Sequence, residues 1–474
     1  MSRRSVVIVG GGIAGLAAAW EASGGIDGPN DVYVQVLDTD PTHGGALRTT
    51  EFAGRTIDLG ADGFLATRSE VVAFVNELGL GDQLVPIGAS GAWIYLDGSL
   101  DKIPTGLVLG VPTRWAQVRS VPHLSRRAKL GALRDLTLPK RLRVSGDMSI
   151  GDILRVKFGN ALVDELIEPM IGGIQAGRVD TLSAAEVFPA LLRAAERGGS
   201  LMRAIRPPQP STPPSTPAPL FYSLRHGVGS LPTQLRERLL ERGVVFHLGE
   251  PVTSLRATPR EPRVWAVETA TSLTPADVVI VAAPPQVAGS LLGQLSPELR
   301  ELEFMESASS TMVTFAVRRS TVTLPDTGTG VLVPLQTPFR AGDDSMITTA
   351  VTLLDRKWPH LAHDDDVLVR VHTGRIDDRR AQAMSDSDVT SRVTAEMVQL
   401  FGAWPVRESI VQRWPEALPQ YYVGHREMID AARSAARAHR VLLAGLAYDG
   451  VGVPASVGSG RQAGREALTL LGYR

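Results

Sequence analysis

The stretch V-V-I-V-G-G-G-I-A-G, from Val6 to Gly15, decides the fold. It begins with a short, wholly apolar run, Val6–Val9, which is typical of a buried parallel strand. Gly10, Gly12 and Gly15 then form a GxGxxG pattern. Glycines at these places permit a tight turn, let a pyrophosphate approach the backbone and allow close packing of helix on strand. The helix that follows would offer amide donors at its N-terminus, so the pattern predicts a dinucleotide site.

The residues that follow complete a β–α–β unit. The alanine-rich stretch 13–23 is predicted to be a helix, and 32–37 returns to strand character. The second strand ends at Asp38, 23 positions after Gly15 (38 − 15). A carboxylate at this place is suited to accept a hydrogen bond from a ribose hydroxyl.

A second glycine-rich segment contains Gly44, Gly45 and Arg48. Adjacent glycines followed by an arginine suit a loop that passes close to a cofactor, with the guanidinium near a phosphate. The alternative is an ordinary glycine turn with a solvated arginine.

Composition limits the classes of function. The formal net charge is −1, so no basic field points to nucleic acid as a partner. The chain has no cysteine, which excludes disulfides, a cysteine nucleophile and a flavin tethered through cysteine. Its nine histidines are scattered, and we predict no metal site. We find no signal peptide and no apolar run of about 18 residues, so we expect a soluble, cytoplasmic protein, with peripheral membrane contact left open.

Elsewhere the pattern alternates between helical and strand character. The stretch 69–78 is predicted to be an amphipathic helix, the region 104–195 is mostly helical, and 206–219 is a proline-, serine- and threonine-rich loop. Strands are predicted at 244–247, 264–268, 278–282, 309–317 and 346–353, and the chain ends with a βα unit at 441–444 and from 459 onward.

Several blocks, in this order, carry a resemblance to a known family. They are G-G-A-L-R-T (44–49), D-L-G-A-D-G-F-L (58–65), E-P-M-I-G-G-I-Q-A-G (168–177), W-P-E-A-L-P-Q-Y (414–421) and G-L-A-Y-D-G-V-G-V-P (445–454). With the GxGxxG unit, they resemble flavin enzymes of the amine oxidase superfamily, and within it the protoporphyrinogen/coproporphyrinogen oxidase family, the coproporphyrinogen type above all.

The resemblance implies an α/β and α+β fold with a Rossmann-like, discontinuous FAD-binding domain, a mixed-sheet substrate domain and a helical domain. The implied FAD-binding parts are 1–66, 222–300 and 428–474. The substrate domain takes 67–103 and 301–427, and the helical domain, facing a membrane or a partner, takes 104–205. A Pro-rich loop covers 206–221.

The resemblance also implies site residues. Non-covalent FAD would contact Gly10, Gly12, Ile13, Ala14, Gly15, Asp38, Gly44, Gly45, Arg48, Gly60, Ala61, Asp62, Val252, Tyr448, Val451, Gly452 and Val453. Arg68 would meet a substrate propionate, with a solvated arginine at a helix start as the alternative. Gly173 would lie near the reacting methylene, with a simple turn glycine as the alternative. No residue is assigned as a catalytic acid or base.

The implied activity is the oxygen-dependent, six-electron oxidation of a porphyrinogen in haem biosynthesis, by hydride transfer to FAD with release of hydrogen peroxide. Coproporphyrinogen III is favoured over protoporphyrinogen IX because no membrane anchor is evident. Contact with a membrane or with another haem-pathway enzyme is left open. The alternatives are another flavin oxidase or desaturase of the amine oxidase type, or a flavin-binding partner protein without turnover.

Overall fold

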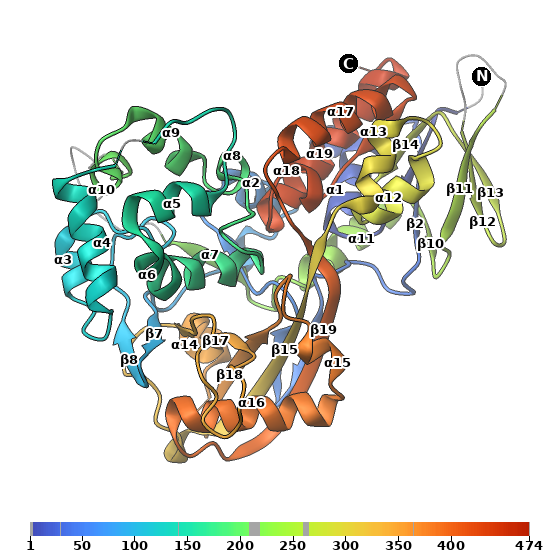
Figure 1. The fold of residues 1–474 in the computed structure, drawn as a ribbon. Coiled ribbons are helices and arrows are strands. Elements are labelled where there is room, and N and C mark those ends of the chain that lie inside the picture. Colours follow the sequence, from blue (N-terminus) through green and yellow to red (C-terminus); the bar gives the residue numbers. More distant parts are fainter. Residues whose placement is uncertain are drawn as a thin grey trace. The chain divides into compact units, whose positions relative to one another are not determined.

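The computed structural model describes residues 3–28, 30–140, 142–207, 219–258, 265–363 and 365–473 (Figure 1). The chain divides into two compact units. Unit 1 is built from Met1–Pro86, Ala218–Met305 and Arg426–Arg474, and unit 2 from Ile87–Pro217 and Glu306–His425. Each unit is therefore assembled from segments that are distant in sequence.

Unit 1 centres on a five-stranded parallel sheet in the order β10-β2-β1-β14-β20. The GxGxxG segment follows its middle strand. The strands are β1 (Ser5–Val9), β2 (Tyr33–Asp38), β10 (Val245–Leu248), β14 (Val278–Val281) and β20 (Val441–Leu443). Val7 pairs with Gln35 on one side and Val279 on the other. The carboxyl ends of these strands meet at one edge, where α/β proteins bind nucleotides.

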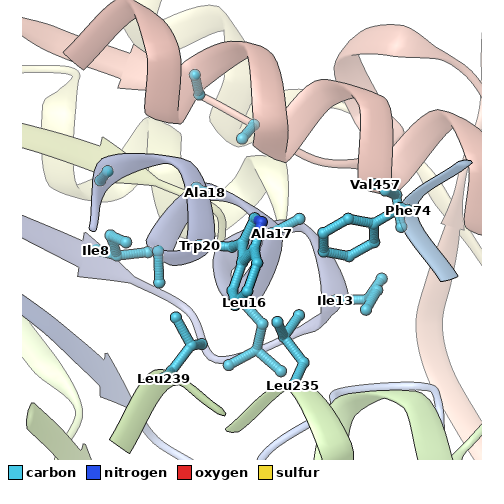
Figure 2. Close-up of a cluster of buried hydrophobic side chains, with 14 of the residues drawn as sticks. Ile8, Ile13, Leu16, Ala17, Ala18, Trp20, Phe74, Leu235, Leu239 and Val457 are labelled. Carbon is cyan, nitrogen blue, oxygen red and sulfur yellow. The ribbon is translucent and has the colours of Figure 1, made fainter. Parts of the chain in front are cut away.

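Both faces of the sheet are buried at β1, β14 and β20, which explains why these strands are almost wholly apolar. Val6 and Ile8 pack with helices α1 (Ile13–Ala22), α11 (Ser230–Glu241) and α19 (Val453–Leu471). Figure 2 shows Leu16 of α1 directed toward Leu235 and Leu239 of α11. On the other face, alternate residues pack with α12 (Pro285–Leu292) and α17 (His425–Ala438).

The first and last helices of unit 1 lie side by side, and small residues make this contact close (Figure 1). A Cβ added at Gly460 of α19 would lie 2.0 Å from the carbonyl oxygen of Ala14. At Gly464, one turn later, it would lie 2.5 Å from the carbonyl oxygen of Ala18. The two helix backbones therefore touch, which only glycine allows.

Smaller elements complete unit 1. They are a three-stranded antiparallel sheet, a hairpin, a second three-stranded sheet and short helices. The first sheet contains β11 (Val252–Ala257), β12 (Trp265–Thr269) and β13 (Leu273–Ala276), and the hairpin contains β3 (Thr49–Phe52) and β4 (Arg55–Asp58). The second sheet contains β5 (Phe64–Leu65), β9 (Phe221–Leu224) and β6 (Leu84–Pro86). The short helices are α2 (Ser69–Glu77), α13 (Pro297–Arg300) and α18 (Leu446–Asp449).

Unit 2 contains a seven-stranded mixed sheet in the order β19-β15-β18-β17-β16-β7-β8. Its strands are antiparallel except for the parallel pair β16 and β7. The bounds are β7 (Trp93–Leu96), β8 (Ser99–Lys102), β15 (Ser307–Arg318), β16 (Gly330–Leu332), β17 (Thr348–Leu353), β18 (Asp366–Thr373) and β19 (Val406–Pro419). One face forms a core with α16 (Asp386–Phe401), while α14 (Leu354–Lys357) and α15 (Arg380–Ala383) lie at its margins.

The rest of unit 2 is helical and has its own core, which includes Ile94 and Leu96 of β7. The helices are α3 (Trp115–Arg119), α4 (Arg126–Thr137), α5 (Ile150–Phe158), α6 (Asn160–Leu162), α7 (Glu168–Gln175), α8 (Ala184–Val187), α9 (Pro189–Arg197) and α10 (Leu201–Ala204). Within the described ranges, no helix combines the length and apolar character needed to cross a bilayer.

The predicted fold class is confirmed, since a discontinuous parallel α/β unit, a mixed sheet and a helical region are all present. The predicted strands coincide with β10, β12, β14, β15 and β17. Residues 67–86, expected to begin the substrate domain, cluster with unit 1. The separation of unit 2 into a substrate and a helical domain stays a prediction. Most of the predicted Pro-rich loop, 208–218, lies outside the described residues.

Candidate cofactor site

The glycine turn after β1 is held tightly against the sheet. The amide of Gly10 donates to the carbonyl of Leu37 at 2.8 Å, so the turn is fixed to the end of β2. Gly10 has a φ of +112°, and a Cβ there would lie 2.6 Å from the carbonyl oxygen of Ala282. A Cβ on Gly15 would lie 1.9 Å from the carbonyl oxygen of Gly10. Both positions therefore require glycine for backbone packing.

Gly12 is different, because its Cα faces open space. It precedes α1 with ordinary φ and ψ of −70° and 175°, and among the described residues none except its chain neighbours has an atom within 4 Å of an added Cβ. No side chain caps the helix that starts at Ile13 and Ala14. The first amides of α1 are thus available to an anion in front of Gly12, which fits a pyrophosphate.

The second glycine segment lies beside the first. The amide of Gly44 donates to the carbonyl of Gly11 at 2.8 Å, and an added Cβ on Gly45 would lie 3.3 Å from the Cα of Gly12. Two glycine-rich loops, 10–12 and 44–45, therefore line one cradle. A side chain at Gly45 would press against the backbone of the first loop.

Arg48 is partnered within the protein. Its Nε donates to the carbonyl of Gly45 at 2.8 Å, and its guanidinium forms an ion pair with Asp40. The guanidinium thus fixes the loop that carries Gly44 and Gly45. A contact of Arg48 with phosphate stays a prediction.

Asp38 stands at the edge of the glycine turn. One carboxylate oxygen accepts from the amide of Gly11, and the other accepts from the amide of Asp40 at 2.8 Å. Each oxygen has a further lone pair that could accept a ribose hydroxyl. Asp38 therefore also holds the glycine turn in place through these hydrogen bonds. Its position in the sequence did not indicate this second role.

The segment with Gly60, Ala61 and Asp62 follows β4. Its first residue is buried and Ala61 is exposed. The segment is anchored by Asp58, which is 5% exposed and accepts from the amides of Val228 at 3.0 Å and Gly229 at 2.8 Å. Sequence reasoning missed this structural carboxylate, because its partners lie about 170 residues away.

Replacing Asp58 should destabilise unit 1. Asp58→Ala leaves two buried amides without this acceptor, so we expect the free energy of unfolding to fall by about 3 kcal/mol. Asp58→Asn keeps one acceptor and should cost about half as much. Thermal and urea unfolding of the purified variants would measure this. Equal midpoints for Asp58→Ala and the parent would contradict it.

The C-terminal turn carries the last four predicted cofactor residues, Tyr448, Val451, Gly452 and Val453. The side chain of Tyr448 is buried in the core of unit 1, with the guanidinium of Arg433 5.9 Å from the ring centre. Its hydroxyl has no hydrogen-bond partner among the described residues, and burial raises the pKa of Tyr448. Val451 is partly exposed and Gly452, at φ +108°, opens α19 at Val453. The contacts of these four residues with a cofactor stay predictions.

The remaining predicted residues belong to three different elements. Val252 begins β11 and is half-buried. Arg68 is exposed directly before α2, in unit 1. Gly173 is exposed on α7, in unit 2, and an added Cβ would meet Leu332 at 3.7 Å. The roles of all three residues stay predictions.

The parallel sheet and the double glycine cradle define a dinucleotide-binding protein of the Rossmann type. The model of the flavin-containing amine oxidoreductase family matches residues 13–468. The chain belongs to this family of flavin-dependent oxidoreductases.

Within this family, the chain is similar to enzymes that are named porphyrinogen oxidases. The chain is 31% identical to the coproporphyrinogen III oxidase of Bacillus subtilis, over 99% of both chains. It is 29% identical to the protoporphyrinogen oxidase of Homo sapiens, over 99% of this chain and 98% of the relative. A crystal structure from Exiguobacterium sp. 255-15, assigned as a protoporphyrinogen oxidase, superimposes with a TM-score of 0.86 at 32% identity, covering 100% of both chains.

Proposed function

We propose that the protein oxidises a porphyrinogen to a porphyrin in haem biosynthesis, with coproporphyrinogen III preferred to protoporphyrinogen IX. The observation that carries this proposal is the similarity to coproporphyrinogen III oxidases over 99% of both chains. The full coverage matters because it includes both units, and not the cofactor unit alone. Molecular oxygen is the proposed acceptor.

The proposed cofactor is FAD, bound without a covalent link. Its pyrophosphate would lie before α1, between the loops that carry Gly12 and Gly45, and a ribose hydroxyl would donate to Asp38. The absence of cysteine removes one route to a covalent flavin. When bound, a flavin accepts a hydride from an electron-rich carbon and passes the electrons to oxygen as hydrogen peroxide.

The protein's own contribution is to bind and orient the flavin and the substrate, and to polarise the flavin ring. The helix α19, which starts at Val453 after the turn at Gly452, has its positive end at this turn. Amides at such an end would stabilise negative charge on a reduced flavin ring. Substrate positioning falls to Arg68 and Gly173 in this proposal, and no residue needs to act as a general acid or base.

The proposed location is the cytoplasm. The proposal also includes peripheral contact with a membrane or with another haem-pathway enzyme. The helices α3 to α10 of unit 2 are the proposed surface for such a contact. This part of the proposal would be tested by co-sedimentation of the purified protein with vesicles.

Anaerobic stopped-flow spectroscopy tests the proposed reaction. Mixing the holoprotein with coproporphyrinogen III should bleach the flavin band at about 450 nm, and admitting oxygen should restore it with porphyrin fluorescence. Protoporphyrinogen IX should bleach the band more slowly. Bleaching by neither porphyrinogen would refute the proposal.

Amines offered in the same experiment separate the alternatives. Bleaching by an amine and by no porphyrinogen would indicate an amine oxidase. A bound flavin that no substrate reduces would indicate a flavin-binding partner protein without turnover.

A further inference from the structure

Unit 2 contains a cavity of about 300 Å³ that is rich in arginine. It lies between the β16–β17 margin of the sheet and the segment after β18. This volume is at the lower end of ligand pockets, so it suits a side arm of a ligand better than a whole macrocycle. The charged residues of its lining are Arg178, Arg375, Asp377, Asp378, Arg379 and Arg380.

Arg375 is the unusual member of this lining. Its side chain is only 2% exposed, yet Nε and both terminal nitrogens have no hydrogen-bond partner among the described residues. Thr348, which also lines the cavity, is 3% exposed and its hydroxyl likewise has no partner in the described part of the chain. Buried donors without acceptors are costly, and a guanidinium is the most demanding of them.

The carboxylate closest to Arg375 is engaged by other groups. The fully buried carboxylate of Glu168 accepts from the amide of Val179 at 3.0 Å and lies 3.2 Å from the Nε of Arg178. It lies 4.0 Å from Arg375, beyond hydrogen-bonding distance. One buried carboxylate therefore lies near two arginines that line the cavity, and it reaches only Arg178 closely.

The neighbouring acids do not supply the missing acceptor. The carboxylate of Asp378 accepts from Arg380 at 2.7 and 2.9 Å, and that of Asp377 lies 3.3 Å from Arg178. Burial lowers the pKa of the Arg375 guanidinium, and Glu168 counters this only in part. A carboxylate entering the cavity would supply the missing acceptor, because it matches the planar fork of an arginine.

The cavity adjoins the helix that carries a predicted substrate residue. An added Cβ on Gly172 of α7 would lie 2.1 Å from a terminal nitrogen of Arg375, so the arginine packs directly against this helix. The amide of Ile376 also donates to the carbonyl of Ala176, at the end of α7, at 2.8 Å. Gly173, the next residue along α7, is the one proposed to lie near the reacting carbon.

We propose that the cavity at Arg375 binds one carboxylate arm of the substrate, with Arg375 and Thr348 as its donors. This inference rests on the proposed function, and it names a specificity-determining site of that reaction. A substrate with four propionates presents such an arm more often than one with two, so the site favours coproporphyrinogen over protoporphyrinogen.

The test compares the holoprotein with the variant Arg375→Met, which removes the charge and keeps much of the volume. Coproporphyrinogen III and its tetramethyl ester serve as substrates in the same nonionic detergent. We expect the KM for the free acid to rise about ten- to a hundredfold with kcat changed less than about threefold, because a hydrogen-bonded charge pair is lost. The KM for the ester should change less than about twofold, since it carries no carboxylate.

Arg407→Met is the matched control. Arg407 pairs with Asp366 in unit 2 and does not line the cavity, so its removal should leave both KM values unchanged. Thr348→Val should raise the KM for the free acid a few-fold. An unchanged KM in Arg375→Met, or an equal rise for acid and ester, would overturn the inference.

Two further measurements keep the test decisive. If Arg375→Met fails to fold, the double variant Glu168→Gln/Arg375→Met removes both buried charges and takes its place. Binding of the product coproporphyrin III, followed by its fluorescence, needs no turnover and should weaken at least about tenfold in the variant. A wild-type protein that binds this porphyrin but oxidises no porphyrinogen would refute the proposed function alone, whereas equal binding by wild type and variant would refute the carboxylate site.

Discussion

Replacing Gly12 with valine should give a protein that folds normally but has lost its flavin. The backbone at Gly12 has φ and ψ values that any residue adopts, and an added Cβ meets no atom within 4 Å among the described residues other than its chain neighbours. The valine methyl groups would instead fill the space before the first amides of α1. Displacing a pyrophosphate from these donors should lower flavin affinity by about a hundredfold or more.

Fluorescence titration of the apoprotein with FAD would measure the affinity, and thermal unfolding of the apoprotein would show that the fold is intact. Gly458→Ala is the matched control, since Gly458 of α19 also has open space around an added Cβ. It should keep full affinity. A Gly12→Val protein that binds FAD as tightly as the parent would show that the pyrophosphate does not lie before α1.

Gly460→Ala should cause a large loss of stability in unit 1. The new Cβ would lie 2.0 Å from the carbonyl oxygen of Ala14, so α19 and α1 must move apart. Overpacking of this kind costs about 3 kcal/mol when backbone cannot yield. Because α1 also carries the glycine cradle, weaker flavin retention should follow.

Urea unfolding of the apoprotein, with hydrogen exchange of the α1 amides, would measure this loss. Gly458→Ala serves again as the control. It lies two residues away on the same helix and should be neutral or slightly stabilising, by about 0.5 kcal/mol, because alanine favours helix more than glycine does. An unchanged midpoint in Gly460→Ala would contradict the close contact of the two helices.

The sequence predicts the core of unit 1 well, because the signals there are local. The apolar run Val6–Val9, the glycines after it and Asp38 all lie within one β–α–β unit. Residues that are close in this part of the sequence are therefore also close in the structure. The pairing of the two glycine loops followed from the resemblance, and the contact of Gly44 with Gly11 agrees with it.

The features that sequence reasoning missed depend on contacts between distant residues. Asp58 meets Val228 and Gly229, and Arg375 approaches Glu168, across separations that no local pattern encodes. The burial of the Tyr448 ring in the core of unit 1 is a matter of side-chain direction that spacing does not reveal. Its contact with the cofactor, which the resemblance implies, stays a prediction.

The order in which unit 1 is assembled has a consequence for the living cell. The strand β20 and the helix α19 come from the last segment of the chain, after all of unit 2 has been synthesised. While the ribosome is still translating unit 2, β14 therefore lacks β20, one of its two neighbours in the sheet, and α1 lacks the helix that packs against it. Unit 1 can thus be completed only after unit 2 has been synthesised, so we expect the cofactor to bind after translation of the chain.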